Sequence, residues 1–171
     1  MNLIGTVKLE SPRLILRRGT LEDAEEMFKN WASDDEVTKY LTWDSHKTIK
    51  DTIDILKMWV KQYGTSTFFQ WIIELKSEKF PIGTINLFSV NLKEESCEIG
   101  YCLGSKYWGL GYASEACREV LNFAFNRIGF KVVYARHEIH NPASGRVMEK
   151  NGMKYLFSMV LPELIFDINF H

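Results

Sequence analysis

Hydrophobic residues follow two different spacings along the chain, and each spacing predicts one kind of element. Over short segments bounded by glycine, proline and polar residues they alternate with polar residues or run continuously, as in β-strands. Over longer segments they recur every three or four residues, as in helices that bury one face. Strands are expected at residues 14–18, 68–75, 81–90, 96–103 and 132–139, with two more after Met153. Helices are expected from Thr20 onward and at residues 33–41, 48–64, 112–128 and 144–151.

The order of these elements indicates an α+β fold. Three consecutive strands within residues 68–103 are separated by short polar segments, which is typical of an antiparallel meander. Helices and strands alternate on either side of it, so we expect the order β-α-α-β-β-β-α-β-α-β-β around a mixed sheet. No linker, low-complexity segment or repeat interrupts the pattern, and we therefore expect one domain over residues 1–171.

Polar residues at the expected helix starts support these boundaries. Thr20 precedes Asp23 by three residues and Ser33 precedes Glu36 by three, which is the spacing of a capping box. The helix within residues 48–64 has its own cap and stop signals, a threonine before it and a glycine at its end. Its inward face is predicted to carry Ile49, Ile53, Leu56, Val60 and Tyr63.

Composition and charge narrow the function classes. Of the 171 residues, 46% are hydrophobic and 25% are charged, and the formal net charge is −1, which is typical of a globular domain. A nucleic-acid partner is not expected, because contacts to many phosphates need a more basic surface. A membrane partner is not expected either, because no apolar run is long enough to span a bilayer and the N-terminus lacks a signal-peptide pattern. The 3 cysteines have no Cys-x-x-Cys spacing, which favours a reduced, cytoplasmic protein.

A Gly-x-Gly turn stands between the meander and the helix that follows it. Gly109 and Gly111 lie directly before the helix expected at residues 112–128. Glycines let several backbone N–H groups point at one spot, and a helix N-terminus adds unpaired donors and the positive end of its dipole. The turn therefore predicts a phosphate-binding loop, although a purely structural turn explains two glycines equally well. A Walker loop is excluded because no Gly-Lys-Ser/Thr follows, and Ser114 stands where a dinucleotide fingerprint needs glycine or alanine.

Four short motifs in the second half of the chain favour the phosphate-loop interpretation. They are Glu-Ile-Gly-Tyr at 98–101, Tyr-Trp-Gly-x-Gly-Tyr-Ala-x-Glu-Ala at 107–116, Asn-x-x-Ser at 141–144 and Asn-Gly-Met at 151–153. In this order, and with a helix and a strand between them, they resemble the GNAT superfamily of N-acetyltransferases. The branch that they resemble most is that of the ribosomal-protein N-terminal acetyltransferases and their relatives. Residues 11–28 resemble the first strand and helix of the same branch, so the resemblance covers nearly the whole chain.

The resemblance implies a GNAT fold, with a mixed, mostly antiparallel central sheet, helices on both faces and one splayed pair of strands. The strands at 96–103 and 132–139 would diverge and accept the pantetheine arm of acetyl-CoA between them. The glycine loop would bind the pyrophosphate. The chain departs from the family pattern at Lys106, where Gln or Arg is common, and at Met153, where an aromatic residue is usual. The implied cofactor residues are Tyr101, Cys102, Leu103, Lys106, Trp108, Gly109, Leu110, Gly111, Tyr112, Ala113, Asn141 and Ser144.

Acetyl transfer to an amine needs a proton acceptor, donors for the carbonyl oxygen and a hydrogen-bond donor for the departing thiolate. Glu98 is the candidate base, directly or through a water, and a solvated strand glutamate is the alternative. Ser144 is the candidate donor to the thiolate, and the same residue is also a candidate N-cap of the next helix. Asn141 either contacts the cofactor or only forms a turn with Pro142. Backbone N–H groups at residues 100–103 are the candidates for the carbonyl oxygen.

The acceptor site is expected on the segment that joins the early helices, as in relatives, with Tyr40, Trp43 and His46 as its residues. The expected reaction is direct transfer from acetyl-CoA to a primary amine, either a protein N-terminus or a small amine. Two alternatives stay open, a CoA-binding module without transfer activity and nucleotide binding at the glycine loop. No histidine pair has the spacing of metal ligands, so no metal site is expected.

The C-terminal segment carries two further expectations. A short turn is expected between the last two strands, around residues 161–163. Apolar residues in this segment suit a contact between subunits, and relatives are often dimers, so a homodimer is a hypothesis for this chain.

Overall fold

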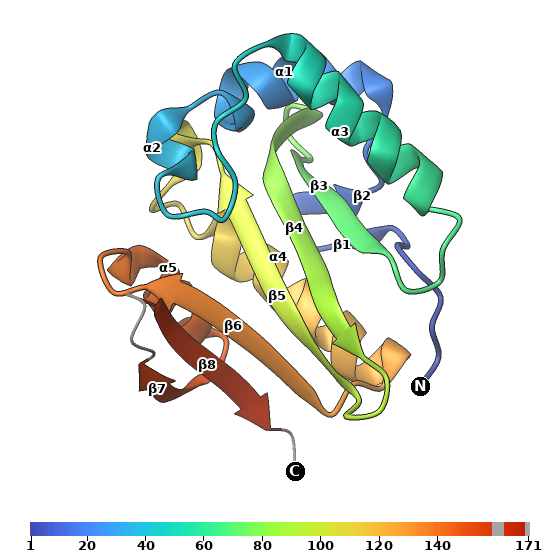
Figure 1. Ribbon diagram of the computed structural model, residues 1–171, viewed down its shortest axis with the longest axis vertical. Helices are drawn as coiled ribbons and strands as arrows, with labels where there is room; N and C mark the ends of the chain where they lie inside the picture. Colours follow the sequence, from blue (N-terminus) through green and yellow to red (C-terminus); the bar gives the residue numbers. More distant parts are fainter. Residues whose placement is uncertain (159–162, 170–171) are drawn as a thin grey trace.

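The described strands form an eight-stranded sheet that runs through the molecule (Figure 1). The computed structural model describes residues 1–158 and 163–169 of the chain. The strand order is β1-β2-β3-β4-β5-β6-β8-β7. The strands are β1 (Leu9–Glu10), β2 (Leu14–Arg17), β3 (Phe69–Leu75), β4 (Phe80–Asn91), β5 (Ser96–Leu103), β6 (Val132–Glu138), β7 (Lys154–Ser158) and β8 (Glu163–Asn169).

The antiparallel meander is confirmed, and β3 lies near its centre. Strand β3 pairs antiparallel with β2 and β4, and β4 pairs antiparallel with β5. Both faces of β3 are covered, because Trp71 and Ile73 belong to one hydrophobic core and Ile72 belongs to another on the opposite face. A strand that is buried on both sides can be apolar at nearly every position, which explains its sequence Phe-Gln-Trp-Ile-Ile-Glu-Leu.

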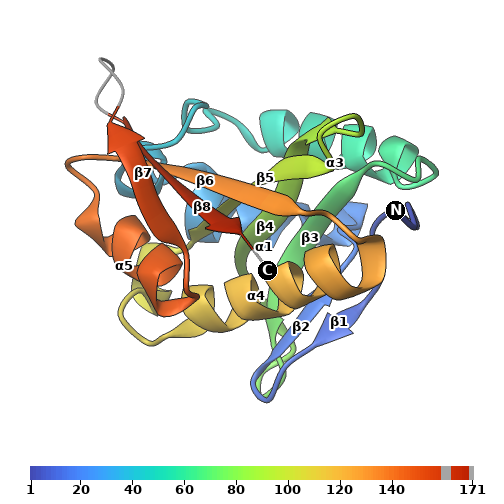
Figure 2. The same cartoon turned by 90° about the horizontal axis from the view of Figure 1, so that it is seen from below.

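Helices cover both faces of the sheet, as expected for the α+β fold (Figure 2). The core on one face contains Trp31, Leu56 and Trp59, which come from the early helices. The core on the other face contains Val120 and Met148, which come from the later ones. The helical segments are η1 (Leu21–Asp23), α1 (Ala24–Met27), η2 (Phe28–Ala32), α2 (Asp35–Thr38), α3 (Ile49–Gln62), η3 (Ser105–Tyr107), α4 (Tyr112–Asn122), η4 (Phe123–Ile128) and α5 (Pro142–Lys150).

The start of α2 corrects the predicted capping box at Ser33 and Glu36. Asp34 is the cap, and one of its carboxylate oxygens accepts a hydrogen bond from the backbone N–H of Glu36 at 2.9 Å. Ser33 is instead the C-cap of the preceding segment η2, and its hydroxyl donates to the carbonyl oxygen of Phe28 at 2.6 Å. The segment η2 is a π-helix, and the spacing of its hydrophobic residues does not distinguish it from an α-helix. Helix α2 also ends at Thr38 and not at residue 41. The capping boxes at Thr20 and Thr48 are both present.

The inward face of α3 is rotated from the predicted one. Ile49 and Val60 are exposed, while Thr52 and Trp59 are buried beside Leu56. Thr52 was counted as polar in the hydrophobic pattern, yet its hydroxyl makes a contact of 2.7 Å with His46 Nδ1 and is thereby accommodated inside. A polar side chain thus lies on the buried face of this amphipathic helix, with a partner in the segment just before the helix.

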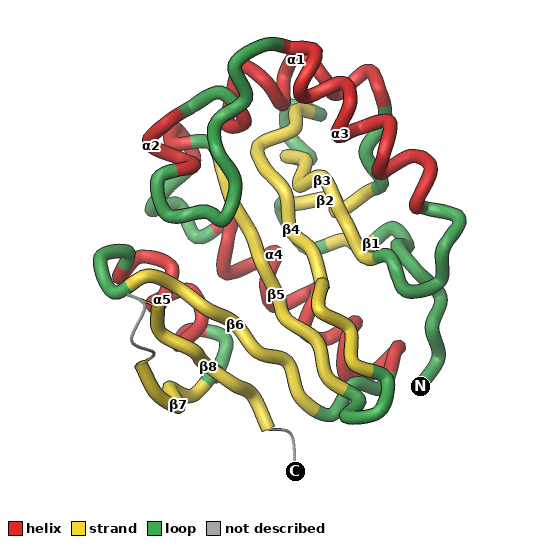
Figure 3. Tube along the Cα trace, in the orientation of Figure 1, coloured by secondary structure: helices red, strands yellow, loops and turns green. Residues whose placement is uncertain are grey.

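Strands β5 and β6 diverge, and the tube in Figure 3 follows both. They pair in parallel only where Ser96 to Glu98 face Val132 to Tyr134. Beyond Glu98, β5 continues beside β4 alone, and β6 continues beside β8. The splayed pair that the family resemblance implied is therefore present.

Two boundaries near this opening differ from the prediction. Helix α5 begins at Pro142, and Asn141 is its N-cap, accepting a hydrogen bond from the backbone N–H of Ser144 at 3.3 Å. The N-cap role considered for Ser144 is therefore wrong. Proline is well suited to the first helical position, because its missing N–H has no helical partner there. The two C-terminal strands are confirmed as β7 and β8, and residues 161 and 162 of the predicted turn lie outside the described residues.

Candidate active site

Two cavities meet where β5 and β6 diverge. The first has a volume of about 510 Å³ and lies between the sheet and the helices α1 and α3; we call it the helix-side cavity. The second has a volume of about 450 Å³ and lies against the glycine loop and α5; we call it the loop cavity. Leu41, Tyr101, Cys102, Asn141 and Ser144 line both. A ligand in one cavity can therefore reach a ligand in the other at these residues.

The glycine loop shapes one wall of the loop cavity. Gly109 and Gly111 both have positive φ, at 73° and 82°, a backbone conformation that other residues rarely adopt. Gly111 is the N-cap of α4, so the unpaired N–H groups of the first helical turn begin directly after it. Together with the positive end of the helix dipole, these donors suit an anionic ligand.

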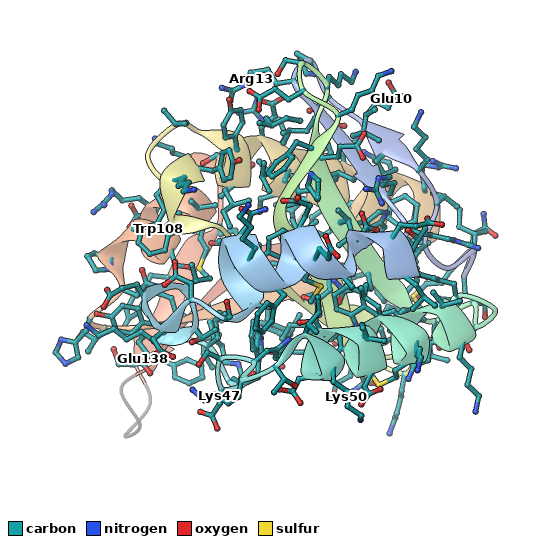
Figure 4. All side chains as sticks on the ribbon, turned by 90° about the horizontal axis from the view of Figure 1, so that it is seen from above. Glu10, Arg13, Lys47, Lys50, Trp108 and Glu138 are labelled. Atoms are coloured by element: carbon teal, nitrogen blue, oxygen red, sulfur yellow. The ribbon has the colours of Figure 1, made fainter. Side chains whose placement is uncertain are left out.

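Most of the residues predicted for the cofactor do line the loop cavity. They are Tyr101, Cys102, Leu103, Trp108, Gly109, Gly111, Tyr112, Ala113, Asn141 and Ser144. Lys106 and Leu110 do not line it, and both are exposed. The indole of Trp108 donates to the carbonyl oxygen of Leu103 at 2.9 Å, which fixes this half-exposed side chain at the surface (Figure 4).

The loop is held from outside by an arginine that the sequence did not single out. Arg13 Nε donates to Glu115 Oε2 at 2.6 Å, and Arg13 Nη1 donates to the carbonyl oxygen of Leu110 at 3.0 Å. The same guanidinium lies 4.4 Å from the centre of the Tyr112 ring. Ser11 Oγ donates to the other oxygen of Glu115 at 2.6 Å. Burial opposes ionisation of Glu115, but the bonds from Ser11 and Arg13 outweigh it and lower its pKa. The start of α4 is thus tied to the N-terminal hairpin.

The charged residues that line the two cavities have opposite balances. The loop cavity is lined by Arg146 and Lys150 of α5 against a single acid, Glu36. The helix-side cavity is lined by two carboxylates, Glu98 and Glu138, and by one positively charged side chain, Arg136. The loop cavity therefore favours an anion and the helix-side cavity a cation. Arg146 and Lys150 are four residues apart on one helix, a spacing that in hindsight marked them as neighbours.

Tyr101 and Ser144 face each other at the junction of the cavities. The hydroxyl of Tyr101 donates to the backbone carbonyl of Ser144 at 2.9 Å, and it lies 3.1 Å from Ser144 Oγ. Burial raises the pKa of Tyr101, so this hydroxyl keeps its proton. Beside them, Cys102 Sγ lies 3.3 Å from Thr84 Oγ1. Burial raises the pKa of Cys102 as well, so this thiol stays protonated.

Glu98 lies in the helix-side cavity and forms an ion pair with an arginine. Arg136 Nε donates to Glu98 Oε2 at 2.8 Å, and the side chain of Glu98 is 22% exposed. Glu98 is thus neither a fully solvated strand residue nor an isolated buried one. A pairing between β5 and β6 positions it, because Glu98 and Tyr134 face each other at the last paired position before the strands separate.

The three residues predicted for the acceptor fall into different cavities. Trp43 and His46 line the helix-side cavity, while Tyr40 lines the loop cavity. Burial lowers the pKa of His46, and nearby Asp51 opposes the shift only in part. His46 is held in place by its backbone N–H, which donates to Ala32 O at 2.7 Å, and by a ring contact with Trp43. Lining residues that the sequence did not indicate include Met27, Ile55, Gln70, Thr84, Asn86, Phe88, Arg136 and Glu138.

The described residues do not support a cysteine nucleophile, a metal site or a membrane-spanning helix. Burial raises the pKa of Cys97 and of Cys117 to about 12, so neither is poised as a thiolate nucleophile. Within residues 1–158 and 163–169, no group of three or more His, Cys, Asp or Glu side chains gathers where it could hold a metal ion. None of the helices in the same residues is long and apolar enough to span a membrane.

Comparison with known proteins identifies the family. Residues 13–154 match the acetyltransferase (GNAT) domain. The chain belongs to the GNAT acetyltransferases. It is therefore an acetyl-CoA-dependent acyltransferase with an N-acetyltransferase fold, and the loop cavity has the chemistry that this donor requires: helix N-terminal donors and basic residues for its phosphates.

Relatives agree with this assignment. The chain is 34% identical over 146 residues to a Bacillus subtilis protein named uncharacterized N-acetyltransferase YoaA, and the match covers 85% of this chain and 82% of YoaA. The crystal structure of a GNAT-family acetyltransferase from Bacillus anthracis is 27% identical, with a TM-score of 0.82 over 95% of this chain and 98% of that one. The microcin C7 self-immunity acetyltransferase MccE, solved with acetyl-CoA and AMP, shares the fold at 16% identity, with a TM-score of 0.80 over 94% of each chain.

Proposed function

We propose that this acetyltransferase moves the acetyl group of acetyl-CoA directly to a primary amine while both are bound. The observation that carries the proposal is the pair of cavities with opposite charge balance, joined at Tyr101 and Ser144. An anionic donor suits the loop cavity, and an ammonium suits the helix-side cavity. Bound there, acetyl-CoA supplies an acetyl thioester that an amine can attack, provided that both are held in register.

On this proposal the donor is held by backbone and basic groups. The N–H groups after Gly111 and the side chains of Arg146 and Lys150 bind its phosphates. Asn141 and the free side of β5 hold its arm, because β5 pairs with β6 only as far as Glu98. The backbone N–H groups of residues 100–103 that face this opening are then available to the carbonyl oxygen as charge develops on it.

The proposed proton transfers involve two groups. Glu98 takes a proton from the acceptor ammonium, directly or through a water, and the released amine attacks the carbonyl carbon. Ser144, held by Tyr101, donates a hydrogen bond to the departing sulfur, which leaves as the thiolate of CoA while the second proton of the attacking nitrogen passes to that thiolate or to water. Arg136 keeps the Glu98 carboxylate at the mouth of the opening, and the incoming ammonium competes with it for the same oxygen.

The acceptor on this proposal is a protein N-terminus or a small amine. The motifs at residues 98–116 and 141–153 support placement near the ribosomal-protein N-terminal acetyltransferase branch. The chain has a formal net charge of −1, which gives no indication of a ribosome-sized basic surface, so we do not extend the acceptor of that branch to this protein. We also propose that residues 1–171 form a single domain, in keeping with the sheet that joins its first and last strands.

The test is acetyl transfer measured by mass spectrometry, with Glu98→Gln beside the wild type. The acceptors are peptides with N-terminal Ala or Ser, phenylalaninamide, spermidine and an amino sugar. We expect the wild type to acetylate at least one, and Glu98→Gln to lose about 100-fold or more in kcat with an unchanged Kd for acetyl-CoA. Glu94→Gln is the matched control, since Glu94 is exposed in the turn before β5 and should behave as wild type.

Two outcomes contradict parts of the proposal. Full activity in Glu98→Gln would remove Glu98 as the base and leave the transferase function intact. Tight binding of acetyl-CoA without transfer to any amine would favour a CoA-binding module.

A further inference from the structure

The walls of the helix-side cavity are mostly apolar and aromatic. Trp31, Trp43 and Trp59 come from the early helices and the loop between them, and Phe88 comes from β4. Trp31 is fully buried and Trp59 is 9% exposed, so these rings are fixed in the core, whereas Trp43 at 36% exposure stands nearer the entrance. An occupant of this cavity gains most by burying apolar surface of its own.

Few charged side chains in the cavity lining can bind that occupant. Glu98 and Glu138 are the carboxylates in the lining, and Arg136 is already paired with Glu98 at 2.8 Å. Counted over the carboxylates and the guanidinium alone, the lining therefore carries one net negative charge. That balance matches one ammonium group. A molecule with three or more ammonium groups would bring more positive charge than these carboxylates balance, and burying an ammonium without a carboxylate partner is unfavourable.

The floor of the cavity supplies polar groups from the sheet. Gln70 of β3 is 7% exposed, and its amide nitrogen reaches only a long contact of 3.4 Å to the carbonyl of Trp71. Asn86 of β4 lies against Gly100 of β5, where an added Cβ would come within 2.9 Å of its Oδ1. Two side-chain amides suit an occupant that has a carbonyl or amide beside its apolar body.

We propose that the acceptor is a monoamine with an aromatic or branched apolar body and an adjacent carbonyl or amide, such as an amino-acid amide, and not a polyamine or amino sugar. This inference rests on the proposed function, because it assigns the second cavity to the acceptor. A volume of about 510 Å³ lies in the range of small-molecule sites. The aromatic walls bind the body, Glu98 and Glu138 attract the single ammonium, and the floor amides bind the carbonyl.

The experiment compares kcat/KM for phenylalaninamide, glycinamide and spermidine at saturating acetyl-CoA. Phenylalaninamide should exceed both of the others by at least about tenfold, since one well-buried ring is worth that much. Trp43→Ala should lower kcat/KM for phenylalaninamide several-fold more than for glycinamide, and the Kd for acetyl-CoA should not change. Met58→Ala is the control, because Met58 is exposed on α3 and lies outside the cavity lining.

The outcomes separate this inference from the function beneath it. If spermidine is acetylated as well as phenylalaninamide or better, the transferase function stands and the acceptor class is wrong. If Trp43→Ala affects phenylalaninamide and glycinamide equally, the aromatic wall does not select the acceptor and the class is also wrong. If no amine is acetylated while acetyl-CoA binds, the proposed function is wrong, and the inference about the acceptor is wrong as well.

Discussion

Tyr101 contacts both the backbone carbonyl and the hydroxyl of Ser144. Tyr101 OH bonds the Ser144 carbonyl and lies 3.1 Å from Ser144 Oγ. Burial raises the pKa of Tyr101, so its phenol remains a donor at neutral and mildly alkaline pH. Ser144 also stands in the first turn of α5, where Asn141 accepts the bond from its backbone N–H. Its backbone is thus fixed by the cap and its side chain by the tyrosine.

At this scale we predict that Ser144→Ala lowers kcat about 100-fold, the loss expected when one hydrogen-bond donor to developing negative charge is removed, while the Kd for acetyl-CoA changes little. Steady-state kinetics and calorimetry measure the two quantities separately. Tyr101→Phe should give a smaller loss in the same direction, because it only releases the serine. The double variant should be no worse than Ser144→Ala alone, as expected of residues that act as a unit. An unchanged kcat in Ser144→Ala would rule out its role at the sulfur.

Among elements, the start of α4 depends on a hairpin from the other end of the chain. Arg13 and Ser11 both bind Glu115, and Arg13 also binds the loop carbonyl of Leu110. The loop needs positive φ at Gly109 and Gly111, a shape that depends on its surroundings to stay defined. We infer that Arg13 positions the loop for phosphate without being required for the chemistry.

We therefore expect Arg13→Met to raise the Kd for acetyl-CoA about tenfold, the cost of roughly one charge-assisted hydrogen bond, with kcat close to wild type. Isothermal titration calorimetry measures the Kd for acetyl-CoA, and saturation kinetics measure kcat. Arg13→Lys should recover only part of the affinity, because lysine lacks the planar fork. Arg127→Met is the control, since Arg127 lies over the Phe123 ring at the far end of the same helical run. A fall in kcat with an unchanged Kd would contradict the positioning role.

Across the whole molecule, the sheet leaves β7 as its last strand. Tyr155, Leu156 and Phe157 of β7 are all more than 40% exposed, at 51%, 42% and 52%. Both faces of this edge strand are thus apolar and accessible, an arrangement that monomers usually avoid. These exposed apolar residues of β7 support the homodimer hypothesis drawn from the C-terminal sequence.

We predict a dimer in sedimentation velocity at micromolar concentration, and a monomer for Phe157→Lys with the same far-ultraviolet circular dichroism. Lysine on an edge strand opposes pairing because its charge would be buried. Met58→Lys introduces the same charge on exposed α3 and should leave the dimer intact. A wild-type monomer that is stable to concentration would remove the hypothesis.

The sequence by itself predicted the meander and most of the helices and strands, because these follow from local periodicity, whereas the divergent strands were implied only by the family resemblance of its motifs. Ser96–Leu103 was placed to the residue, and the glycine loop was placed before its helix. The family match at residues 13–154 confirms the fold class and the donor that the motifs implied.

Only the tertiary structure decided which distant side chains share a cavity. Arg13 reaches Glu115 across 102 positions, and Arg136 reaches Glu98 across 38. No local pattern encodes such pairs, since their geometry depends on how whole elements pack. The same reason explains the rotated face of α3, the placement of Tyr40 apart from Trp43, and the opposite charges of the two cavities on which the acceptor proposal depends.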